Sequence, residues 1–195
     1  MGNEDIIYDY WWAGMERSYH VNVKQIALEA GSTRRLYEME REELAGLDGV
    51  SGTYADDIVE RRSGWDLEGE YEKFLMTGIR MIPWYSDEYP RRLKEVAGHP
   101  FAIFCLGRLP DDDKLSVAVI GARDCSQYGR MTAERFGADL AGYGVQIVSG
   151  MAYGIDGLSQ KAAMEAGGLS FAVLGCGVNT CYPASNRGLD RKSVV

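Results

Sequence analysis

The chain has 195 residues, a length that suits one domain or two small ones. Hydrophobic residues make up 46% of it, enough for a packed core, which excludes a chain that is disordered throughout. The formal net charge of −8 argues against a protein that holds nucleic acid on a broad basic surface. However, residues 1–115 carry 14 basic and 23 acidic side chains, whereas residues 116–195 carry 7 basic and 6 acidic ones. The acidity therefore belongs to the first part of the chain.

Residues 1–66 are predicted to form a small all-α domain, because apolar residues recur there at helical spacing. Gly31 is suited to end one helix and Ser32 to cap the next. Neighbouring aromatic residues near the start are typical of a helix–helix core, although a base-stacking platform is the alternative. These residues are Tyr8, Tyr10, Trp11 and Trp12.

A Gly-Val-Ser-Gly turn at residues 49–52 separates two further helical stretches. This pattern resembles a helix-hairpin-helix, whose turn amides can bind a DNA phosphate. Asp48, Asp56 and Asp57 lie close by, and their field repels phosphate. We therefore favour a purely structural turn.

No apolar run approaches the roughly 18 residues that a membrane-spanning helix needs, and residues 1–5 lack the regions of a secretory signal. A cytoplasmic protein without a metal site is expected, because the cysteines form no C-x-x-C pair and read as reduced thiols. These are Cys105, Cys125, Cys176 and Cys181. His20 and His99 stand apart from any plausible nucleophile, so no catalytic residue is identified.

The second part of the chain, residues 67–195, is predicted to be α/β. A helix at about 67–77, a short strand at 79–82 and an apolar strand at 101–106 lead into it. Three further buried-strand patterns alternate with helices, at residues 117–120, 145–148 and 170–174.

Each of these three strands ends in a glycine turn, at Gly121, Gly150 and Gly175. The glycines are 29 and 25 positions apart, the length of a βαβ unit, so the strands should be parallel with all three turns at one carboxyl edge. Such an edge is where open α/β sheets bind ligands. Glycines allow close approach, and helix N-termini offer N–H groups to an anion. Arg123, Ser126 and Ser149 can add donors.

The known nucleotide fingerprints are missing from this edge. The first turn lacks G-x-G-x-x-G, Ser149 stands where an acidic residue is expected, and no Walker A lysine is present. The pattern thus favours a phosphate-reading surface over NAD or ATP chemistry.

Several ordered motifs resemble the DNA-processing protein A (DprA/Smf) family from about Ile79 to Leu189. They are V-I-G-A-R at 119–123, S-G-M-A-Y-G-I-D at 149–156, A-V-L-G-C-G at 172–177, Tyr182-Pro183 and Asn186. The resemblance implies a Rossmann-like parallel sheet with helices on both faces, preceded by a sterile-alpha-motif-like domain. It also implies a non-enzymatic protein without cofactors that binds single-stranded DNA, protects incoming DNA, loads the RecA recombinase in natural transformation and forms a homodimer.

The resemblance also implies the residues that bind DNA. The first phosphate loop would contain Gly121, Arg123, Ser126 and Gly129, supported by Tyr128. The second would contain Ser149, Gly150, Ala152 and Gly154, supported by Tyr153, Asp156 and Gln160. Gly175, Gly177, Tyr182, Pro183 and Asn186 would complete the wall. Asp156 is expected to orient the backbone or Arg123, because a carboxylate repels phosphate.

Three features depart from the family pattern. Gln160 replaces a frequent histidine, and Tyr153 replaces a frequent Lys or Arg, exchanging a charge for a stacking face. The chain also stops at Val195, where the family's fold continues, so we expect a C-terminally truncated, incomplete sheet. Two alternatives remain open: a nucleotide-binding enzyme such as a nucleotide phosphoribohydrolase, and an interaction module that binds a partner through its N-terminal helices.

Overall fold

The computed structural model describes residues 5–17 and 22–190, so the expectations for His20 and for the extreme N-terminus lie largely outside the described residues. The chain divides into two compact units, Met1–Phe104 and Cys105–Val195. The division falls later than the boundary at residue 66 that the sequence suggested. The reason is that residues 80–104 pack onto the helical core of the first unit.

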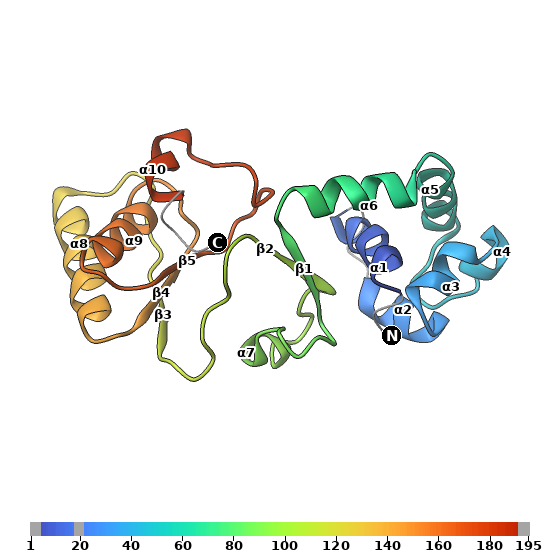
Figure 1. Ribbon diagram of the computed structural model, residues 1–195, viewed down its shortest axis with the longest axis horizontal. Coiled ribbons are helices and arrows are strands. Elements are labelled where there is room, and N and C mark those ends of the chain that lie inside the picture. The colour runs from blue at the N-terminus through green and yellow to red at the C-terminus, as the bar shows by residue number, and fades with distance from the viewer. Residues whose placement is uncertain (1–4, 18–21, 191–195) are drawn as a thin grey trace. The chain divides into compact units, whose positions relative to one another are not determined.

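The first unit is helical at its start and ends in a two-stranded sheet (Figure 1). Its elements are α1 (Ile6–Ala13), η2 (Gly14–Arg17), α2 (Val23–Ala30), α3 (Thr33–Glu38), α4 (Arg41–Leu44), α5 (Gly52–Ser63), α6 (Leu67–Met76), β1 (Arg80–Pro83), α7 (Arg91–Lys94) and β2 (Ala102–Cys105). Ser32, Ser51 and Asp66 cap α3, α5 and α6, because each side chain accepts a hydrogen bond from an amide in the first turn.

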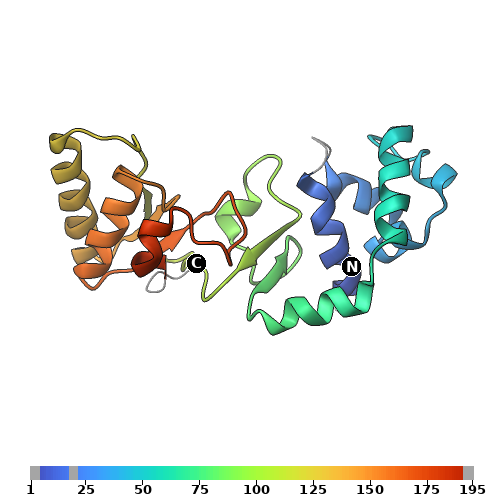
Figure 2. The same cartoon turned by 90° about the horizontal axis from the view of Figure 1, so that it is seen from above.

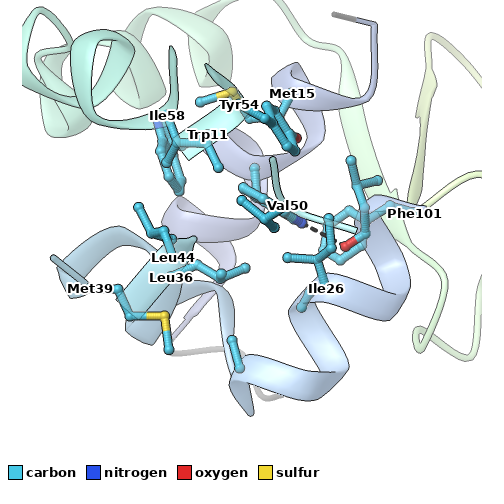
Figure 3. Packing of buried hydrophobic residues seen from close by; sticks show 14 of the residues in the cluster. Trp11, Met15, Ile26, Leu36, Met39, Leu44, Val50, Tyr54, Ile58 and Phe101 are labelled. Carbon is cyan, nitrogen blue, oxygen red and sulfur yellow. Dashed lines mark hydrogen bonds between the residues drawn. The ribbon is translucent and has the colours of Figure 1, made fainter. Parts of the chain in front are cut away.

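The core of this unit is built from the aromatic residues near the N-terminus and from aliphatic residues of the helices (Figure 3). Trp11 and Trp12 are buried, and the Trp12 indole donates to the Val23 carbonyl at 2.9 Å. Tyr10 stacks on Phe74 of α6 with ring centroids 4.5 Å apart. The prediction that the aromatic cluster is core is confirmed.

The two-stranded sheet belongs to the same core. Phe101 lies among the buried residues of the helices (Figure 3), and Ala102 is buried in the same cluster. The Trp84 amide donates to the Phe101 carbonyl at 2.8 Å. Buried Asp9 of α1 accepts hydrogen bonds from Thr33 of α3 and from the Tyr85 hydroxyl after β1. These contacts explain why the first unit extends to Phe104.

The Gly-Val-Ser-Gly turn lies between α4 and α5. Val50 is buried in the core, the Ser51 hydroxyl accepts from the Tyr54 amide at 3.1 Å, and Arg41 bonds to Asp56 at 2.6 Å across the turn. These contacts support the structural interpretation of the turn.

The second unit holds a parallel three-stranded sheet in the order β3-β4-β5. Its elements are β3 (Ser116–Ala118), α8 (Gln127–Gly142), β4 (Gln146–Ser149), α9 (Ile155–Glu165), β5 (Ser170–Ala172), η3 (Ala184–Asn186) and α10 (Arg187–Asp190). The predicted parallel strands are confirmed, although each differs by a few residues at its ends. Val119 and Val173 continue the pairing beyond the regular strands, because their amides donate to the Val148 and Ser149 carbonyls.

Helices α8 and α9 cover one face of this sheet (Figures 1 and 2). On that face Ile147 packs against Ala141 and Ala163. Ile120 and Val173 follow strand positions that alternate to the opposite face and are 73% and 68% exposed. The predicted α/β fold with a parallel sheet is thus confirmed, although among the described residues helices cover one face of the sheet where the prediction had them on both.

Across residues 5–17 and 22–190, the structure has no helix that is both long and apolar enough to cross a membrane.

Candidate nucleic-acid interface

The parallel register of the second unit brings the three glycine turns to one edge of the sheet. Val117 pairs with Ile147, and Ile147 pairs with Ser170, so the strands run side by side and end together. The carboxyl ends of parallel strands meet at one edge, the usual ligand site of an open α/β sheet. The predicted gathering of the turns is confirmed.

Asp156, in the first turn of α9, joins the first two turns. Its Oδ1 accepts from the Gly121 amide at 3.2 Å, and its Oδ2 accepts from the Gly150 amide at 3.1 Å. The side chain is buried. A carboxylate that accepts backbone N–H bonds from two loops holds both in position. The expected backbone-orienting role of Asp156 is therefore confirmed.

The first two turns approach each other so closely that glycine is required. A Cβ on Gly121 would lie 2.7 Å from the Ile155 side chain. A Cβ on Gly154 would lie 2.2 Å from the Ala122 carbonyl and 2.5 Å from the Arg123 carbonyl, and Gly154 has a φ of +73°. The backbone of Arg123 thus lies directly against the start of α9.

The segment that follows the third turn is hydrogen-bonded to the second turn through Asn186. The Asn186 amide donates to the Met151 carbonyl at 2.9 Å and to the Ala152 carbonyl at 3.4 Å. Met151 is buried and has a φ of +54°, a backbone conformation that few residues other than glycine adopt. Asn186, which was expected to line the wall of the site, therefore holds a strained turn in position.

Four backbone amides of the first two turns and the start of α9 donate hydrogen bonds within the protein. Those of Gly121 and Gly150 donate to Asp156, that of Ile155 to the Ala122 carbonyl, and that of Gly157 to the Ala152 carbonyl. This corrects the expectation for the Gly121 and Gly150 amides, which are not free to bind an anion here.

Two of the expected site residues serve the interior instead. The hydroxyl of buried Ser149 donates its single proton to the Val119 carbonyl at 2.6 Å, which ties β4 to the end of β3. Gln160 is buried, and its amide donates to the Phe171 carbonyl at 3.1 Å. Both side chains are buried, and their hydrogen-bond donors are used within the sheet, so neither meets a ligand in this structure.

The first loop leads into α8 through a helix cap. The Ser126 hydroxyl accepts from the Gly129 amide at 3.2 Å, which leaves its proton available to a ligand. Gly129 itself lies close to Cys125 and Ile155, and Tyr128 is exposed beside it. Ser126 and Gly129 thus shape the loop, while Tyr128 faces solvent.

The side chains exposed at this edge include charged and aromatic groups. No hydrogen bond or ion pair joins the exposed Arg123 guanidinium to another of the described residues. The rings of Tyr153 and Tyr182, from the second turn and the third segment, are half exposed with centroids 6.4 Å apart. Gly175 is exposed with open space around its Cα. The edge thus offers the Arg123 cation, hydroxyl groups and aromatic faces, the chemistry that suits a nucleic-acid strand. The exposed carboxylate of Asp124 follows Arg123 directly in the chain.

Sequence reasoning missed two residues that build this edge. Ile155 fills the space against Gly121, and Met151 forms the strained turn that Asn186 holds. The available signal was the glycine directly before each of them, Gly150 before Met151 and Gly154 before Ile155. Such glycines indicate a tight approach that a large neighbour fills.

The family model described as DNA recombination-mediator protein A matches residues 80–194, more than half of the chain. The Smf protein of Escherichia coli is 43% identical over 103 residues, which cover 53% of this chain and 28% of that protein. The solved structure of DNA processing protein A from Streptococcus pneumoniae superposes with a TM-score of 0.72 at 27% identity, covering 95% of this chain and 63% of that one.

A second solved structure concerns the single-stranded DNA binding mode of DNA processing protein A from Helicobacter pylori. Its TM-score is 0.50 at 24% identity, covering 60% of this chain and 52% of that one, so the likeness concerns the fold alone. The chain thus spans only part of the length of these relatives. The match over residues 80–194, which contain all three turns, shows that the chain belongs to the DNA recombination-mediator protein A family.

Proposed function

We propose that this protein binds single-stranded DNA at the three-turn edge of its parallel sheet. It protects the incoming strand and delivers it to the RecA recombinase during natural transformation. The protein works by binding rather than by catalysis, acts in the cytoplasm, and does so as a homodimer in its full-length form. The observation that carries this proposal is the meeting of three turns at one edge with an exposed Arg123, in a chain of this family.

The charge distribution supports a local contact with DNA. Residues 116–195 carry 7 basic and 6 acidic side chains, so this region is close to neutral and does not repel phosphate as the acidic first part does. The exposed Arg123 guanidinium can neutralise a phosphate, whereas the Ser126 hydroxyl adds a hydrogen bond and no charge. The expected binding is therefore modest and depends moderately on salt.

The test is a fluorescence anisotropy titration of the protein with labelled oligo-dT at several salt concentrations. For single strands, the logarithm of the binding constant should fall with the logarithm of the salt concentration by about 0.7 per neutralised phosphate. Arg123→Ala should lower affinity and reduce this slope by roughly one phosphate contact.

The matched control is Arg135→Ala. Arg135 is an exposed arginine of α8 that forms an ion pair with Asp139 at 3.4 Å. Its loss should leave the slope unchanged. Binding that does not respond to salt, or an Arg123→Ala variant that binds like the wild type, would contradict the proposed site.

Delivery to RecA is tested separately. With single-stranded DNA already covered by a single-strand binding protein, addition of this protein should shorten the lag before RecA hydrolyses ATP. Arg123→Ala should shorten the lag less, because it binds DNA more weakly. An unchanged lag with a DNA-binding protein would remove RecA from the proposal and leave DNA binding intact.

A further inference from the structure

Three tyrosines are exposed at the three-turn edge, Tyr128, Tyr153 and Tyr182, and the last two form a ring pair, whereas others in the chain are buried. Tyr153 is 48% exposed and Tyr182 is 55% exposed, while Tyr54 and Tyr89 lie in the interior of the first unit. The rings of Tyr153 and Tyr182 lie 6.4 Å apart at an angle of 75°, a T-shaped pair. They come from segments far apart in the sequence, between β4 and α9 and between β5 and η3.

The backbone next to Tyr153 lies against the backbone of Arg123. Gly154, the neighbour of Tyr153, approaches the Arg123 backbone so closely that a Cβ would lie 2.5 Å from the Arg123 carbonyl. Arg123 and Tyr153 are both exposed, so a charged group and an aromatic group are presented by two backbone segments that lie against each other. A nucleotide pairs these same features, because it carries an anionic phosphate next to a flat base.

We propose that Tyr153 and Tyr182 form a base-stacking platform for single-stranded DNA, with Arg123 bound to the adjacent phosphate; this inference rests on the proposed function. The platform adds binding energy at an edge where the Gly121 and Gly150 amides are used internally. Stacking on an aromatic ring accepts any base, because every base has a π-face.

The T-shaped geometry defines how a base can bind. The two rings stand nearly at right angles, so they do not form one continuous surface on which several bases could stack in a column. A base that stacks on the face of one ring is therefore nearly perpendicular to the other ring. The platform therefore holds one unstacked base, and it discriminates against duplex DNA, whose bases are stacked and paired.

The variant that carries the test is Tyr153→Ala, because Tyr153 is half exposed. Tyr182 is less suitable, because the buried Pro183 follows it and a change there could disturb the packing. Its affinity for oligo-dT should fall by about 5- to 150-fold, the range measured for loss of one stacked base. The salt slope should stay at the wild-type value, because no charge is removed. Tyr153→Phe, which keeps the ring, should bind within about twofold of the wild type.

Tyr143→Ala is the matched control, because Tyr143 is an exposed tyrosine at the opposite end of α8. It should bind oligo-dT like the wild type. Equal losses in Tyr143→Ala and Tyr153→Ala would assign the effect to a general change in the protein surface and would overturn the platform.

A second measurement leaves the protein unaltered. An oligonucleotide with abasic sites throughout keeps the phosphates but offers no base. Wild-type protein should bind it more weakly than oligo-dT with the same salt slope, and Tyr153→Ala should bind both with similar affinity. Equal wild-type affinity for the two strands would overturn the platform while leaving phosphate binding in place.

The outcomes also separate this inference from the proposed function. If the wild type binds oligo-dT with a slope that Arg123→Ala reduces, but Tyr153→Ala changes nothing, only the platform fails. If the wild type binds no single-stranded DNA, the proposed function and the platform fail together. Duplex DNA that binds as tightly as oligo-dT would also contradict the platform.

Discussion

At the scale of single residues, each of the two units contains a buried carboxylate that accepts hydrogen bonds, Asp9 in the first and Asp156 in the second. Asp156 accepts one amide bond from each of two turns and thereby holds the three-turn edge together. Asp9 instead connects α1 to α3 and to the segment after β1, through Thr33 at 2.7 Å and through Tyr85. Each buried carboxylate is tolerated because hydrogen bonds compensate for the loss of water.

Asp9 gives the first unit a dependence on pH. Burial raises the pKa of the Asp9 carboxyl above its ordinary value, while hydrogen bonds from Tyr85 and Thr33 act in the opposite direction. In the unfolded chain the carboxyl ionises at its ordinary, lower pKa. The stability that this group contributes is therefore full at acid pH and is lost as the pH rises through its raised pKa in the folded state.

The variant Asp9→Asn should remove this dependence. Relative to the wild type, its free energy of unfolding should rise as the pH increases from about 4 to about 7. Urea denaturation at several pH values measures the difference. Tyr85→Phe should extend the wild-type dependence to higher pH, because it removes a hydrogen bond that lowers the Asp9 pKa. Parallel pH curves for the wild type and Asp9→Asn would contradict this account.

At the scale of elements, the site depends on how closely α8 and α9 pack. A Cβ on Gly137 of α8 would lie 2.2 Å from the Ser159 carbonyl of α9, where backbone cannot yield without moving a helix. The position of α9 in turn sets Asp156 and Gly154. The contact between the helices is thus one condition for the geometry of the edge.

Gly137→Ala should destabilise the chain by about 1–3 kcal/mol, because overpacking forces the two helices apart. Gly142→Ala is the control in the same helix, since a Cβ there meets nothing within 4 Å. It should be neutral or stabilising by up to about 1 kcal/mol, because alanine favours helix more than glycine does. Thermal and urea unfolding compare the two. A Gly137→Ala variant as stable as Gly142→Ala would show that the helices are packed more loosely.

The sequence predicted the architecture of the second unit better than the roles of its polar residues. Glycine spacing and apolar runs indicate parallel strands and their shared edge, because those patterns are local. Whether Ser149 and Gln160 face a ligand or the interior depends on partners at Val119 and Phe171, which no local pattern specifies. Asp156 was expected to orient the backbone because a carboxylate repels phosphate, and its bonds to the Gly121 and Gly150 amides agree with that role.

At the scale of the whole molecule, chemistry and charge divide between the two units. The first unit has a continuous core of aromatic and aliphatic side chains and carries most of the acidic residues. The second has a smaller cluster of buried residues around Ile147 and leaves Ile120 and Val173 exposed on one face of its sheet. The net charge of −8 therefore describes mainly the first unit and does not exclude DNA binding by the second.

The central claim is that DNA binds at the three-turn edge of the second unit, and hydrogen–deuterium exchange with and without oligo-dT tests it most directly. The account predicts slower exchange on binding in residues 121–130, 150–157 and 175–183, with residues 49–52 of the helical turn unchanged. Slower exchange confined to residues 49–52, or spread evenly over both units, would contradict it.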